Sequence, residues 1–146
     1  MAISRALRRL LSVRQLEEQQ SRLELESAVA ELQERQAALM HNAERNSTGR
    51  RIFSTGVRND MLTDRLAGIE EQRASARHAV RLRERVNEAD QRVQILRDSY
   101  LATRIERQQA QTLIEEMAER DAQEALRRAQ QDMDDWYRGR SLRQPE

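Results

Sequence analysis

The chain has 146 residues, of which 38% are hydrophobic and 35% are charged, with a net charge of +1 and no cysteine. Only four residues are aromatic and one is proline, which disfavours a globular core, a sheet sandwich and a βαβ enzyme fold. The balanced charge argues against nucleic-acid binding, and the lack of cysteine excludes disulfides and thiolate metal sites. No apolar run approaches the roughly 18 residues of a membrane span, so we predict a soluble, intracellular, rod-like helical protein.

The first predicted element is a helix over about residues 3–46. Residues 1–48 contain neither glycine nor proline, and apolar residues recur at spacings of four and three. The heptad positions are Leu25, Val29, Leu32, Gln36, Leu39 and Ala43. A second apolar stripe, out of phase with these heptad positions, precedes them in the sequence: Leu7, Leu10, Val13, Leu16 and Leu23. Both stripes need a partner helix, because an isolated amphipathic helix leaves its apolar face in water.

A polar turn is predicted next, over about residues 47–59. Asn, Ser, Thr and Gly gather at residues 46–49 and 54–56, and Asn59-Asp60 follows. Such side chains compete for backbone hydrogen bonds, and glycine permits positive φ, so the cluster is typical of a turn. Asn59 or Asp60 is a candidate N-cap for the next helix.

The second predicted helix covers about residues 60–138 and is followed by a flexible basic tail at 139–146. Residues 69–138 again lack glycine and proline, although Gly68 just before them allows a kink. A first seam comprises Leu62, Leu66, Ile69, Ala76 and Val80. A second, one step out of phase, comprises Ala79, Leu82, Val86, Ala89, Val93, Leu96 and Tyr100. Phase shifts of this kind change the winding of a coiled coil locally.

These elements predict an all-α fold: a single domain (1–146) that forms an antiparallel two-helix coiled-coil hairpin with the second helix longer than the first. A turn centred near Ile52 would bring apolar residues together along the whole first helix. The expected pairs are Leu39 with Leu66, Leu25 with Val80, Leu16 with Ala89, and Leu10 with Leu96. In that register roughly 35 residues of the second helix, about 50 Å, extend past the first.

Charge is segregated along the chain, and no catalytic constellation is present in the sequence. Residues 45–59 carry four arginines and no acid, whereas residues 110–135 carry eight acids against three arginines. We find no phosphate-binding glycine loop and no nucleophile elbow. The two histidines, His41 and His78, have no ligand partner at helical spacing beyond a single Glu44. We therefore expect no enzyme activity, no catalytic residue, no metal site and no cofactor, and neither a nucleic acid nor a small-molecule substrate as a partner.

The layout resembles the FliJ/YscO family, the small coiled-coil stalk proteins of flagellar and injectisome export ATPases. The features that match are the helix opening at Ala6-Leu7-Arg8-Arg9-Leu10-Leu11, the polar turn, the longer second helix, and the basic, proline-containing ending at residues 138–146. That ending resembles flagellar members. The absence of lysine and of tyrosines around the turn departs from the family pattern.

The resemblance implies a protein like the two-helix shaft of a rotary ATPase, with its helix termini inside the ATPase hexamer. Its turn end would face a membrane export gate protein, and export chaperones would be further partners. The implied location is cytoplasmic, peripheral to the cytoplasmic face of the inner membrane. The chain would couple the ATPase to the gate without catalysing a reaction.

Candidate partner-binding residues follow from position within this implied layout, since aromatic and arginine side chains are the usual interface anchors. Those expected at the ATPase end are Leu7, Arg8, Leu11, Trp136, Tyr137 and Arg138. Those expected at the gate end are Gln36, Leu39, Met40, Arg50, Phe53 and Met61. Phe53 has two interpretations, as an aromatic clamp between the arms of the hairpin or as a docking side chain.

The alternative function is a generic structural coiled coil: a homodimeric spacer that uses the same seams, a scaffold, or a membrane-binding bundle. A symmetric spacer has no need for unequal arms with aromatic residues at the tip. A membrane-binding bundle would place its arginines along one face, whereas here they gather near the ends. The basic amphipathic start at residues 1–16 also resembles an organellar transit peptide, which would predict a shortened mature chain.

Overall fold

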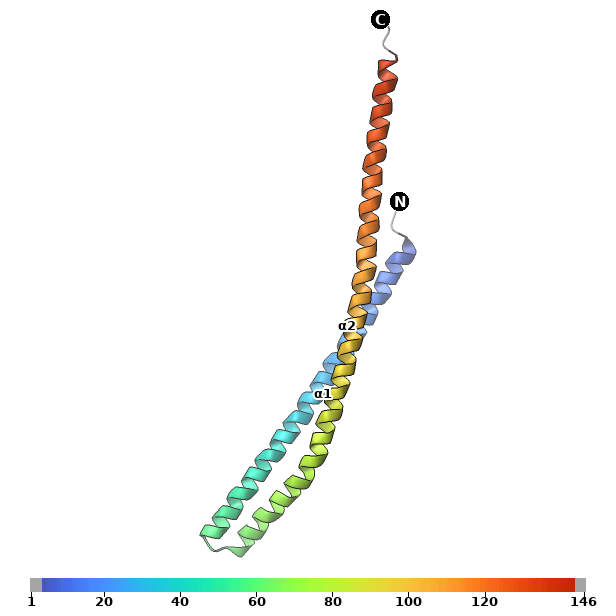
Figure 1. Cartoon of the computed structure of the whole chain (residues 1–146). Helices are drawn as coiled ribbons and strands as arrows, with labels where there is room; N and C mark the ends of the chain where they lie inside the picture. Colours follow the sequence, from blue (N-terminus) through green and yellow to red (C-terminus); the bar gives the residue numbers. More distant parts are fainter. Residues whose placement is uncertain (1–3, 144–146) are drawn as a thin grey trace. The chain divides into compact units, whose positions relative to one another are not determined.

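The computed structural model describes residues 4–143 and contains two long helices in that range. Helix α1 covers Arg5–Arg58 and helix α2 covers Leu62–Ser141, and the two form a helical hairpin with the longer arm second (Figure 1). The predicted fold class is confirmed. Ser4 caps α1, because its hydroxyl accepts a hydrogen bond from the Ala6 amide at 3.2 Å.

The connection between the helices spans only residues 59–61, so the expected bounds were wrong. Helix α1 continues through the predicted turn at 47–59 to Arg58, and α2 runs on to Ser141, into the predicted tail. Asp60 adopts φ of 54°, a conformation that aspartate tolerates. The Met61 amide closes the turn by donating to the Gly56 carbonyl at 2.9 Å. Residues 144–146 of the predicted tail lie outside the described residues.

The polar residues at 46–49 and 54–56, which were expected to form a turn, are helical because they make contacts that a helix allows. The Thr55 hydroxyl donates to the Arg51 carbonyl one helical turn earlier, at 2.9 Å. Gly49 and Gly56 are both buried. A β-carbon added at Gly49 would lie 3.1 Å from the Glu71 β-carbon and 3.1 Å from the Gly68 carbonyl oxygen. These glycines therefore mark a close approach of the two helices, which offsets their low helix propensity.

The chain divides into two compact units, each built from a part of both helices. One unit comprises residues 20–101, with the turn at its centre, and the other comprises 1–19 together with 102–146. In the first unit the Asn42 amide donates to the Ser75 carbonyl at 2.9 Å, and Arg45 pairs with Glu71 at 2.7 Å. In the second unit Arg14 pairs with Glu106 at 2.7 Å.

These pairs show that the expected register was wrong, because the true turn lies later in the sequence than Ile52. Leu16, Leu66 and Val80 were expected to meet apolar partners but are 65%, 58% and 56% exposed. The seam predicted over residues 79–100 is confirmed: Leu82, Ala89 and Val93 are buried, and its other four members are half-buried. The buried residues of α1 differ from its predicted heptad positions: they are Ala28, Asn42, Gly49 and Gly56, at spacings that are multiples of seven.

Candidate interaction surfaces

The end of α2 carries an exposed aromatic cluster in the unit formed by residues 1–19 and 102–146. The Trp136 and Tyr137 rings meet edge to face with centroids 5.1 Å apart, and the Arg140 guanidinium lies 5.4 Å from the centre of the Trp136 ring. Trp136 is 58% exposed and Tyr137 is 59% exposed. Arg138, also predicted at this end, is exposed as well. An aromatic and arginine cluster of this kind is typical of an interface anchor.

The predicted α1 residues of the same end do not lie beside this cluster. Arg8 is exposed, whereas Leu7 and Leu11 are half-buried. Because Arg14 pairs with Glu106, the start of α1 at Arg5, nine residues earlier, lies opposite about residue 115 of α2. Trp136 is roughly twenty residues further along, about 30 Å of helix. The six residues therefore form two separate groups.

Helix α2 extends past the start of α1 as a single helix. We call residues 122–141 the free end of α2; every residue from 122 to 138 is exposed. This overhang is shorter than the roughly 35 residues expected, because the register differs from the one predicted.

The predicted gate-end residues all lie in the unit of residues 20–101. Gln36, Met40, Arg50 and Met61 are exposed, while Leu39 and Phe53 are half-buried. Phe53 faces Gly68: a β-carbon added there would lie 2.6 Å from the Phe53 amide nitrogen and 2.8 Å from its β-carbon. The contact involves the backbone and β-carbon of Phe53, so both interpretations of its ring stay predictions. The binding roles of the six residues stay predictions.

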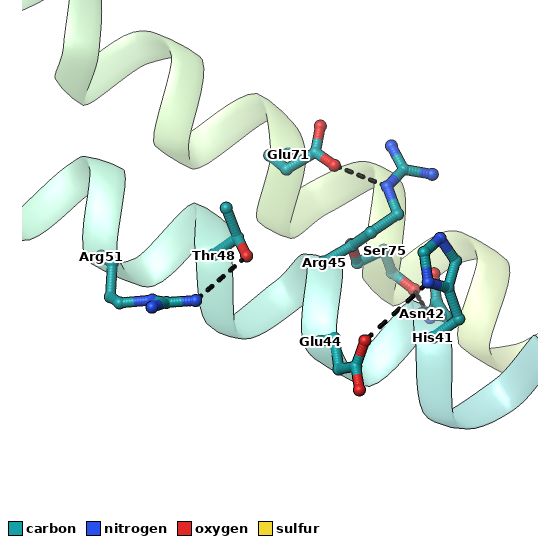
Figure 2. A network of polar contacts seen from close by, with 8 residues as sticks. All are labelled: His41, Asn42, Glu44, Arg45, Thr48, Arg51, Glu71 and Ser75. Carbon is teal, nitrogen blue, oxygen red and sulfur yellow. Dashed lines mark hydrogen bonds and ion pairs between the residues drawn. The ribbon is translucent and has the colours of Figure 1, made fainter.

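A buried polar pair in this unit was missed by the sequence reasoning (Figure 2). Asn42 is 5% exposed and Ser75 is 1% exposed. Asn42 Oδ1 and Ser75 Oγ have no hydrogen-bond partner among residues 4–143. Both line a groove of about 370 Å³ with Leu39, Ala43, Asn46, Ala76, Ala79 and Arg83. A sequence signal does point to this layer. Asn42 and Gly49 are seven residues apart, as are Gly68 and Ser75.

An ion pair joins the helices beside this layer. The Arg45 guanidinium donates a hydrogen bond to Glu71 at 2.7 Å, which lowers the pKa of the Glu71 carboxyl and raises that of Arg45 (Figure 2). Within α1, His41 lies 3.9 Å from Glu44 and Arg51 donates to Thr48 at 3.4 Å. The pair crosses between helices and therefore adds to their attraction, modestly because it is solvent-exposed.

We expect Glu71 to contribute to the fall in the free energy of unfolding at acidic pH. Its pKa is lower in the folded chain than in the unfolded chain, so its contribution is complete above the ordinary glutamate value of about 4.3 and is lost as the pH falls through the folded value. Glu71→Gln should reduce the loss of stability on acidification below about pH 4.3, measured by urea unfolding at several pH values. Glu34→Gln, at an exposed α1 position, is the control. Equal acid limbs for both variants would contradict the assignment.

The described part of the chain also bears on two other kinds of feature, a metal site and a membrane span. No group of three or more histidine, aspartate or glutamate side chains in residues 4–143 is placed to hold a metal ion. Within the same range, no helix has the length and apolar character needed to cross a bilayer.

Comparison with models of protein families shows which family the chain matches. A family model described as "Flagellar FliJ protein" matches residues 4–146, nearly the whole chain. No curated protein and no solved structure matches the chain.

Proposed function

Because the chain belongs to the FliJ family of flagellar proteins, we propose that it is the non-enzymatic stalk of a flagellar-type protein export apparatus. In this role it inserts into the ring of the export ATPase and links that ring to the membrane export gate and to export chaperones. It acts at the cytoplasmic face of the inner membrane and catalyses no reaction. The unequal hairpin supports this proposal more than it supports a symmetric spacer.

The observation that carries the proposal is the free end of α2. Residues 122–138 are all exposed, and Trp136, Tyr137 and Arg140 cluster near the tip, so this helix presents a narrow surface with large anchoring side chains. Such a surface fits the central opening of a ring. The predicted gate-end residues lie in the other unit, so the two proposed partners would bind different parts of the chain. Arg50, Phe53 and Met61 lie within ten residues of the turn at 59–61, whereas Gln36, Leu39 and Met40 lie roughly twenty residues before it.

We expect the purified chain to co-elute with a flagellar export ATPase hexamer at about one copy per ring, as measured by size-exclusion chromatography with light scattering. Replacing Trp136 and Tyr137 together by alanine should weaken this complex at least about thirtyfold, since one hot-spot aromatic contributes about 2 kcal/mol or more and the contributions of neighbouring residues do not add in full. Gln131→Ala, exposed on the same segment, is the matched control and should bind like the unchanged chain.

The outcomes separate the two parts of the proposal. If the unchanged chain does not associate with the ATPase, the stalk function is wrong, and a generic scaffold becomes the better account. If the chain binds and the double variant binds equally well, the aromatic tip is not the contact. Circular dichroism of each variant checks that the helices are retained.

A further inference from the structure

The free end of α2 carries an apolar stripe that is distinct from the seam facing α1. Toward α1, Ala110 is buried and Ile114, Met117 and Asp121 are half-buried. The same spacing continues into polar residues, namely Glu124, Arg128, Gln131 and Asp135. The apolar stripe lies one or two residues after each of these positions, at Ala122, Leu126, Ala129, Met133 and Trp136, and Arg140 continues its spacing. Its spacings of four and three are those of a coiled-coil seam.

Nothing in residues 4–143 covers this stripe. Leu126 is 71% exposed, Met133 is 61% exposed and Trp136 is 58% exposed. Arg140 shares the face of Trp136, since its guanidinium lies over that ring at 5.4 Å. A heptad seam left in water gains free energy when a second helix covers it.

We propose that the stripe is self-complementary and that the free ends of two copies of this chain pair as an antiparallel, two-fold symmetric coiled coil. In one register each residue of the stripe lies opposite another residue of the stripe, or Arg140, on the second copy. This register places Leu126 against Trp136 of the second copy, Ala129 against Met133, and Ala122 against Arg140. Two of these layers combine a small residue with a large one, the complementarity that lets two helices pack closely. A two-fold interface requires that the same surface fit itself, as this one does.

The charges near the pairing set its strength. Arg140, opposite Ala122 of the second copy, falls within one turn of Glu119 on that chain, which is favourable. Asp132 flanks the seam next to the two-fold axis, so two Asp132 side chains approach each other and repel. The overlap is also short, which places the interface at the weak, transient end of the range. The dimer should therefore depend on concentration.

The pairing also has a consequence that rests on the proposed function. It covers Trp136, the side chain that we place at the ATPase contact, so the dimer and the ATPase complex exclude each other. The dimer itself does not depend on that function and is tested without the ATPase.

Sedimentation equilibrium of the full chain over a range of concentrations tests the pairing. The average mass should rise above the 17.1 kDa of one chain as the concentration increases. Trp136→Ala should raise the dissociation constant about thirtyfold. Asp132→Asn should lower it roughly threefold by removing the repulsion. Asp134→Asn makes the same change in net charge on the side of the helix away from the seam and should leave it unchanged.

Three results would overturn the inference. One is a single-chain mass at every concentration for both the unchanged chain and Asp132→Asn. Another is an equal effect of Asp132→Asn and Asp134→Asn, which would show that only net charge matters. The third is a dimer that persists unchanged in Trp136→Ala, since this would place the contact elsewhere. Each leaves co-elution with the ATPase unaffected, so failure of the pairing is distinct from failure of the stalk function.

Discussion

Replacing Gly68 by alanine is expected to destabilise the hairpin by roughly 2 kcal/mol, although alanine is the better helix former by about 1 kcal/mol. The added methyl would lie 2.6 Å from the Phe53 amide nitrogen and 2.7 Å from the Gly49 carbonyl oxygen. Both neighbours are backbone atoms and cannot rotate away as a side chain would. The helices must therefore separate at this crossing, which also loosens the contact of Phe53 with α2.

Urea unfolding followed by circular dichroism measures this effect, and the chain supplies a matched control. Gly139 also lies within α2, but a β-carbon added there has no neighbour within 4 Å. Gly139→Ala should be neutral or slightly stabilising. Gly49→Ala, whose nearest neighbours would lie at 3.1 to 3.3 Å, should fall between the two. Equal stability of the Gly68 and Gly139 variants would mean that the helices do not approach closely at Gly68.

The same crossing explains which parts of the fold could be predicted from the sequence. The seam over residues 79–100 could be predicted because its members are apolar and strictly spaced, and burial follows that pattern. The register could not, because the residues that fix it on α1 are Asn42, Gly49 and Gly56. Polar and glycine residues indicate a turn when only local propensity is considered, whereas here they permit the helices to approach. Tertiary contact outweighed local preference.

The candidate surfaces divide in a similar way. The exposure of Trp136 and Tyr137 could be predicted from the sequence, because both lie beyond the reach of α1, while their role in binding stays a prediction. Leu7 and Leu11 were assigned to the same end by position. In the structure they are half-buried and lie about 30 Å of helix away from Trp136. The Asn42 and Ser75 layer could not be found from composition, since its burial depends on a register that the sequence pattern leaves open.

The ion pair between Glu18 and Arg107 offers the sharpest test of the unit formed by residues 1–19 and 102–146. Their side chains are only 18% and 23% exposed, with Arg107 Nε at 2.6 Å and Nη2 at 3.5 Å from the two carboxylate oxygens. Breaking a pair at this depth should cost more than at the surface, because the remaining charge stays partly desolvated. We expect Glu18→Ala to destabilise the chain by roughly 1–3 kcal/mol.

Charge reversal separates this pair from simple packing. Glu18→Arg alone and Arg107→Glu alone each place like charges together, whereas the double reversal restores attraction and should recover more than half of the loss of the two single variants combined. Arg22→Ala, which removes an exposed pair with Glu26 on α1, should cost less than about 0.5 kcal/mol. Urea unfolding measures these four variants and Glu18→Ala. Strict additivity of the two reversals would mean that the charges are not coupled and that α1 is held here by the burial of its apolar neighbours alone.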